Sequence, residues 1–104
     1  MKSSLKPATK AEKRRFEIIK IEIGCIACRV LFGYYRPANA HHLLSGGRRR
    51  GHSETIPLCF DHHVGNKLST HKTKRLFIET VGEDDELLEE TNRLVAEFES
   101  NVIR

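Results

Sequence analysis

The side chains that could do chemistry are crowded into the middle of the chain. All three cysteines and all six histidines of the 104-residue sequence lie between Cys25 and His71. A lone cysteine is usually a small buried apolar group, and a lone histidine is more often a surface residue than a ligand. Nine such residues in one span predict metal binding. An odd number of cysteines, in a chain whose basic N-terminus does not resemble a signal peptide, points the same way.

Two pairs of residues have the spacing of a zinc knuckle. Cys25 and Cys28 are separated by two residues, and so are Cys59 and His62. A structural zinc ion takes four tetrahedral ligands, and three cysteines with one histidine are a usual set. We therefore predict that these four side chains bind a structural Zn²⁺. The alternative is that Cys59 is a core residue and that the first pair is fortuitous.

The histidines that a single zinc site cannot use are His41, His42, His52, His63 and His71. His41 and His42 are neighbours on a predicted strand, so their side chains point to opposite faces. His62 and His63 are neighbours at the start of a predicted helix, where side chains diverge by about 100°. One strand histidine can then share a metal ion with His63 while the other faces a substrate. Metal-assisted hydrolysis needs this division, because a metal ion stabilises charge and a neutral imidazole takes a proton from water.

The elements that position these residues follow from apolar spacing and turn signals, and they predict an α+β fold. We expect a helix over residues 9–22, a Cys-x-x-Cys knuckle, strands over 38–44 and 55–58 joined by the basic turn SGGRRRG, a short helix from residue 60 or 61, and helices over 72–80 and 84–102. Thr9 and Glu12 have capping-box spacing. The apolar residues at helical spacing are Phe16, Ile19, Ile23, Leu76, Phe77, Leu87, Leu88, Leu94, Val95, Phe98 and Val102.

Charge is unevenly distributed along the chain. Residues 1–78 carry 16 Lys and Arg against five Asp and Glu, a formal charge of +11, whereas residues 79–99 hold nine acidic residues. A body this basic favours a polyanion as partner, although a solvated surface is the alternative. Arginine binds phosphate through a bidentate fork. The candidate phosphate contacts are Arg48, Arg49, Arg50 and Lys67.

These motifs together resemble a known family. The segment AHHLL, the Gly/Arg loop and TIPLCFDHH resemble the HNH (His-Me finger, ββα-metal) endonucleases. With GCIAC, GGRRRGH, His71 and the acidic terminal helix added, the sequence most closely resembles the phage recombination-enhancement, Ref-like RecA-dependent nucleases. The resemblance implies a small ββα-metal core with zinc knuckles and flanking helices.

The resemblance also implies roles for individual residues. His42 looks like the general base, His41 and His63 look like ligands of a catalytic metal ion, and His71 is a candidate third ligand. The implied cofactor is Mg²⁺ or Mn²⁺, and imidazole ligands would also bind Zn²⁺ in a crystal. The Asn that gives the family its middle letter is absent. His52 is a candidate to orient the base in its place, the alternative being an exposed loop residue.

The implied function is that of a metal-dependent DNA endonuclease with little sequence preference, with a RecA filament as a partner, in the cytoplasm of a bacterium that hosts the phage or prophage. We expect a basic, partly disordered tail over residues 1–15, one HNH domain over residues 16–104, no membrane segment and a monomer. One alternative is a non-catalytic, zinc-stabilised nucleic-acid-binding module. Another is a zinc adaptor that binds a protein through the acidic face of residues 83–90.

Overall fold

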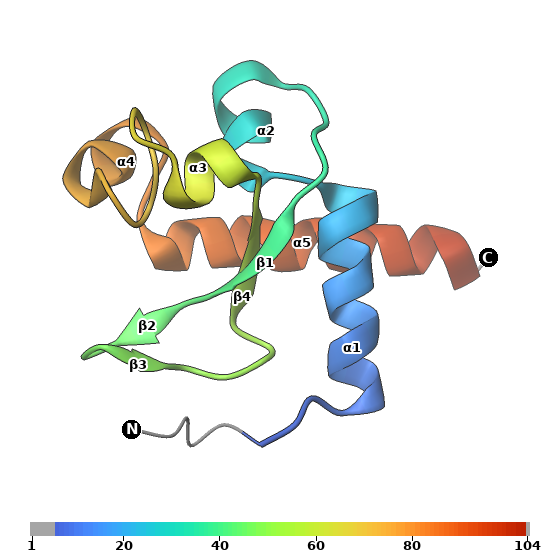
Figure 1. Cartoon of the computed structure of the whole chain (residues 1–104). Coiled ribbons are helices and arrows are strands. Elements are labelled where there is room, and N and C mark those ends of the chain that lie inside the picture. Colours follow the sequence, from blue (N-terminus) through green and yellow to red (C-terminus); the bar gives the residue numbers. More distant parts are fainter. Residues whose placement is uncertain (1–5, 104) are drawn as a thin grey trace.

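Two short antiparallel strands followed directly by a helix lie at the centre of the molecule (Figure 1). The computed structural model describes residues 6–103. In chain order its elements are helix α1 (Lys10–Glu17), π-helix η1 (Ile18–Ile23), helix α2 (Ile26–Phe32), strands β1 (Asn39–His42), β2 (Leu44–Ser45), β3 (Arg48–Arg49) and β4 (Thr55–Leu58), and helices α3 (Phe60–Val64), α4 (Lys74–Thr80) and α5 (Asp84–Ile103). The predicted α+β fold class is confirmed.

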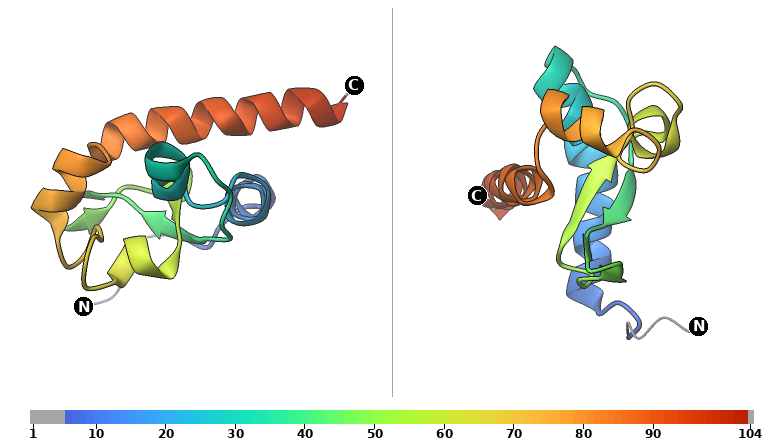
Figure 2. Two further views of the ribbon diagram at one scale, coloured as in Figure 1. Left: turned by 90° about the horizontal axis from the view of Figure 1, so that it is seen from above. Right: turned by 90° about the vertical axis from the view of Figure 1, so that its left-hand side faces the viewer.

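The β1–β4 pair carries the strand histidines. Its register places His41 opposite Ile56 and His42 opposite Thr55. Helix α5 runs along one side of this pair and α3 lies on the other side (Figure 2). The fully buried apolar side chains between these layers include Ile26, Leu43, Ile56, Leu58 and Phe77. Burial of these apolar side chains holds the strands against α5, whereas α3 lies close to the surface.

A π-helical turn adapts the first helix to this core. The Gly24 N–H donates to the Ile19 carbonyl over 2.9 Å, five residues back, which is the π pattern. The wider turn allows Ile18, Ile19 and Ile23 all to be buried. Gly24 ends it with φ +75°, where a Cβ atom would lie 2.6 Å from the Arg36 carbonyl oxygen. Only glycine fits there, and the next residue, Cys25, is thereby held against the same carbonyl.

Helix α1 begins at the predicted cap and is fixed to the rest of the fold by an arginine. The Thr9–Glu12 capping box forms in both directions. The Arg15 guanidinium donates to the Thr55 carbonyl over 2.6 Å and to Asn92 over 2.8 Å, so it ties α1 to β4 and to α5. Of the tail predicted over residues 1–15, the first five residues lie outside those described. The division of the chain at residue 15 stays a prediction.

Three local expectations differ from the structure. The segment after Cys25 forms helix α2, where only a knuckle was expected, because Cys25 caps it by accepting from the Cys28 N–H. The strand predicted over residues 38–44 is interrupted at Leu43, whose side chain is buried in the core. Leu76 was expected to face inward with Phe77, but it is 49% exposed, since only Phe77 lies on the side of α4 that meets the core.

Helix α5 forms as predicted from its apolar stripe and its acidic first turn. Leu87 and Val95 are buried, whereas Val102 is 54% exposed near the end of the helix. None of the helices within residues 6–103 has the length and apolar composition needed to cross a membrane.

The neighbouring Leu76 and Phe77 give a matched test of this core. Phe77→Ala should lower the free energy of unfolding by about 3–5 kcal/mol, because it removes a fully buried ring. Leu76→Ala should change it by less than about 0.5 kcal/mol. Urea unfolding followed by circular dichroism measures both. Equal losses in the two variants would contradict the packing of α4.

Candidate metal centres and active site

The four predicted zinc ligands converge in the core. The Cys59 Sγ atom lies 3.3 Å from His62 Nδ1 and 4.0 Å from Cys28 Sγ, and both Cys25 Sγ and Cys28 Sγ lie 3.6 Å from His62 Nδ1. A tetrahedral zinc ion would set S···S at about 3.8 Å and S···N at about 3.5 Å. The cysteines are free, and a 4.0 Å sulfur separation is far too long for a disulfide. The Cys₃His cluster could therefore hold a structural zinc.

The chemistry of these thiols also fits a bound cation. Burial raises the pKa of the Cys25 thiol to about 12, and burial likewise raises the pKa of Cys28. Without a cation the thiols therefore stay protonated, and in the thiolate form that binds a metal ion the three sulfur atoms would repel one another unless a positive charge compensated them. The Arg36 guanidinium lies 3.6 Å from Cys59 Sγ but also pairs with Asp61, so it compensates only part of that charge. A divalent cation bound to the cluster would supply the remainder.

Helix α3 presents its two histidines in different directions, as predicted. His62 is buried against the cysteines, while His63 faces His41 and His71. The loop after α3 bonds back onto it, because the Thr70 N–H donates to the His62 carbonyl and the His71 N–H donates to the His63 carbonyl. Gly65 permits this turn, since a Cβ atom there would lie 2.3 Å from the Asp61 carbonyl oxygen. The return of the loop is what brings His71 to His63.

His41, His63 and His71 form a second cluster of metal-ligand type. Their ring centroids are 4.8–5.0 Å apart in every pair, and His71 Nε2 lies 3.2 Å from His63 Nε2. One nitrogen atom of each ring lies within 4.8 Å of the others, so three imidazoles surround a common point. His71, the candidate third ligand from the sequence, lies as close to the other two rings as they lie to each other.

The protonation of this cluster suits metal binding. Burial, and then the neighbouring histidines, lower the pKa of His41 to about 4. Burial, and then His71, lower the pKa of His63. These two rings are therefore neutral at pH 7, with lone pairs available to a cation.

His42 lies on the other face of β1 and pairs with His52. Its Nε2 atom is 2.9 Å from His52 Nδ1, and Phe16 of α1 packs edge-on against both rings. Burial, and then the charges of Arg49 and His52, lower the pKa of His42. His42 is therefore a neutral imidazole at pH 7, the form that accepts a proton. It also lines a surface cleft with His41, His63 and His71.

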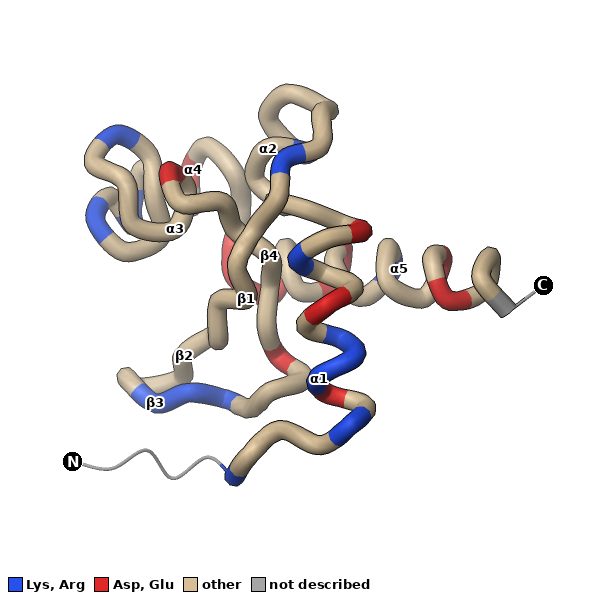
Figure 3. The backbone as a smooth tube through the Cα atoms, turned by 45° about the vertical axis from the view of Figure 1, so that its right-hand side comes forward, with Lys and Arg blue, Asp and Glu red and all other residues tan. Residues whose placement is uncertain are grey.

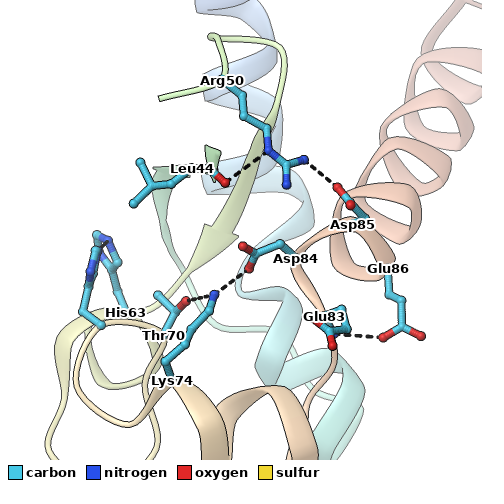
Figure 4. A network of polar contacts seen from close by, with 10 residues as sticks. Leu44, Arg50, His63, Thr70, Lys74, Glu83, Asp84, Asp85 and Glu86 are labelled. Carbon is cyan, nitrogen blue, oxygen red and sulfur yellow. Dashed lines mark hydrogen bonds and ion pairs between the residues drawn. The ribbon is translucent and has the colours of Figure 1, made fainter. Parts of the chain in front are cut away.

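The predicted phosphate contacts differ in their surroundings. Arg48 and Arg49 are exposed on β3, and Arg49 lines the histidine cleft. Arg50 instead pairs with Asp85 at 2.5 Å (Figure 4) and also with Glu54 at 3.5 Å. Lys67 is exposed in the loop after α3, on the side of the candidate zinc ligand His62. Basic segments on β3 and in that loop contrast with the acidic α5 (Figure 3).

One lysine side chain also borders the three-histidine cluster. Lys74 shares a cleft with His41 and His71, and its ammonium donates to Asp84 over 2.8 Å and to Thr70 over 3.1 Å (Figure 4). The first turn of α5 thus holds the side chains of both Arg50 and Lys74.

Sequence reasoning missed the part that helix α1 plays at this site. Phe16 was assigned only to the core face of a helix, yet it packs on His42 and His52. Its position depends on how α1 docks on β4 through Arg15, which no sequence spacing encodes. The contact of His52 with the backbone carbonyl of Lys6 has no side-chain signature at all.

A family model described as recombination enhancement, RecA-dependent nuclease, matches residues 8–96. The chain belongs to this family of RecA-dependent nucleases. None of the curated proteins and none of the solved structures matches it. The resemblance seen in the motifs is thereby confirmed at the level of the family. The match spans both histidine-containing clusters, so a RecA-dependent nuclease carries them within its family region.

The adjacent histidines of α3 provide a matched test of the zinc centre in this RecA-dependent nuclease. The parent should keep about one tightly bound zinc per chain after gel filtration with a weak chelator. His62→Ala should lose this zinc and lower the urea midpoint, because a Cys₃His cage needs its fourth ligand. His63→Ala should keep it. Zinc retained by His62→Ala, or lost by His63→Ala, would contradict the assignment.

Proposed function

We propose that this RecA-dependent nuclease is an HNH-type, metal-dependent DNA endonuclease that hydrolyses phosphodiester bonds with little sequence preference. The observation that carries the proposal is a single cleft lined by three converging imidazoles and by His42, a fourth whose neutral form is favoured. The order of strands and helix also supports it, because β1, β4 and α3 follow the ββα pattern that the motifs resemble.

His42 is the general base in this proposal. An imidazole that is neutral at pH 7 can take a proton from water as it attacks the phosphorus atom. The edge-on contact of Phe16 and the hydrogen bond to His52 restrict the rotation of the ring. His52 thus orients the base, the task for which the sequence made it a candidate.

His41, His63 and His71 would hold the catalytic divalent cation, Mg²⁺ or Mn²⁺. When bound, that cation supplies positive charge to the scissile phosphate and to the leaving oxygen. The three rings come from β1, α3 and the loop before α4. The backbone bonds that return this loop onto α3 hold two of the three ligands in register.

Arg48 and Arg49 would contact the DNA backbone beside the cleft, and Lys67 would extend the basic surface. Arg50, which pairs with Asp85 and Glu54, instead holds the hairpin formed by β2 and β3 in place. Phosphate contacts carry no sequence information by themselves, which fits low specificity. RecA filaments are the proposed partner because the family is RecA-dependent.

A non-catalytic, zinc-stabilised nucleic-acid-binding module is the competing function. It would use the Cys₃His cluster and the basic β3, but it gives no role to the second cluster or to the His42–His52 pair. It predicts DNA binding without cleavage in any divalent cation.

His42→Ala tests the proposal directly. It should slow nicking of supercoiled plasmid by at least about a hundredfold, measured with RecA filaments and Mg²⁺ or Mn²⁺, because the proposal assigns the other three imidazoles of the cleft to the metal ion. As the control for folding, the variant should keep its zinc content and urea midpoint. A variant that cuts at the parental rate would show that His42 is not the base. If the unmutated protein binds DNA but does not cut it, the result would favour the non-catalytic nucleic-acid-binding module.

Arg49→Ala and Arg50→Ala form a matched pair for the DNA contact. Arg49→Ala should reduce the slope of log Kd against log salt by about one, because one phosphate contact is lost. Arg50→Ala should lower the urea midpoint and leave that slope nearly unchanged, because its charge is already paired. Filter binding to plasmid fragments over a salt series measures the slopes. An equal reduction in both variants would contradict the division of roles.

A further inference from the structure

The segment that precedes α1 touches the proposed active site. The described chain begins beside the loop that joins β3 to β4 (Figure 1). There the backbone carbonyl oxygen of Lys6 lies 2.6 Å from His52 Nε2. On the other side of the same ring, His52 Nδ1 lies 2.9 Å from His42 Nε2. A continuous row of hydrogen bonds therefore runs from a main-chain carbonyl to the base.

The carbonyl determines where the protons of this row lie. A carbonyl oxygen only accepts, so His52 Nε2 must carry the proton that it donates to Lys6. A neutral His52 then presents Nδ1 as an acceptor, and His42 must donate from Nε2. This leaves Nδ1 of His42 without a proton. The Lys6 carbonyl thus selects the tautomer of the base two rings away.

The surrounding structure keeps this carbonyl in place. Only Pro7 and Ala8 separate Lys6 from Thr9, which the capping box fixes at the start of α1. Phe16 covers His42 and His52 from the same helix. The Lys6 carbonyl, the Phe16 ring and the Thr9 cap therefore belong to one N-terminal segment, which packs against the loop between β3 and β4.

We propose that the backbone carbonyl of Lys6 is a positioning group of the nuclease, which acts through His52 to hold His42 with Nδ1 free to accept a proton. The proposal rests on the role of His42 as the base. It makes the segment Lys6–Thr9 part of the catalytic machinery and not merely a basic tail.

The first test reads the tautomers in the full chain and does not depend on activity. Long-range ¹H–¹⁵N correlation spectra at pH 8 should show both His42 and His52 protonated at Nε2. A His42 ring protonated at Nδ1, or a His52 ring protonated at Nδ1, would overturn the proposal. This result stands even if the protein cuts no DNA, so it separates the failure of this inference from the failure of the proposed function.

The second test compares two shortened chains with the full chain. A chain of residues 6–104 keeps the Lys6 carbonyl and should keep the kcat for plasmid nicking at saturating DNA. A chain of residues 8–104 keeps Thr9 and the cap but loses the carbonyl, and its kcat should fall about tenfold. Zinc content and urea midpoint report whether each chain is folded.

The same shortening in a His52→Ala background supplies the control for a general structural effect. There the row of hydrogen bonds is already broken, so removing residues 6 and 7 should cause no further loss of kcat. A tenfold loss that persists without His52, or equal kcat values for the 6–104 and 8–104 chains, would overturn the proposal.

Discussion

The divergence of two neighbouring histidines on helix α3 is the constraint on which the rest of the structure depends. His62 points into the cysteine cluster and His63 points to the other imidazoles, so one short helix belongs to both centres. A chain of this size buries only a small apolar core, and a bound metal ion adds to the stability that such a core provides. An ion in the Cys₃His cluster would fix α3, and through α3 it would set where His63 and the following loop lie. Zinc binding at His62 would therefore also affect the position of His63 in the second cluster.

The acidic start of α5 holds the opposite side of the cleft. Asp85 pairs with Arg50 at the end of the hairpin and Asp84 pairs with Lys74 of α4. Charges that could have served a protein partner are thus used within the molecule, which weakens the idea of an adaptor that binds through this helix. The same pairing leaves Arg48 and Arg49 as the free cations of the hairpin within residues 6–103. The ion pairs therefore separate the exposed basic edge of the hairpin, which is the proposed DNA contact, from the arginine that is paired within the molecule.

The sequence predicts most where spacing within one element decides the outcome. The two knuckle pairs, strand β4 and helix α5 were found in this way, as was the divergence of His62 and His63. Spacing does not predict which side chains are buried or in contact where tertiary packing determines this. Leu76 has the same apolar character as Phe77, but only the rotation of α4 against the core tells them apart. Likewise, the π-turn of η1, the contact of Phe16 with His42 and the reach of the Lys6 carbonyl depend on how distant segments dock.

Anomalous X-ray diffraction from crystals grown with Mn²⁺ tests the central claim most directly, because it locates and identifies each ion. Two separate ions per chain are expected. The zinc signal should lie among Cys25, Cys28, Cys59 and His62, and the manganese signal should lie among His41, His63 and His71. A chain that holds zinc in the cysteine cluster but no ion between His41 and His63, with those rings turned apart, would contradict a catalytic metal centre.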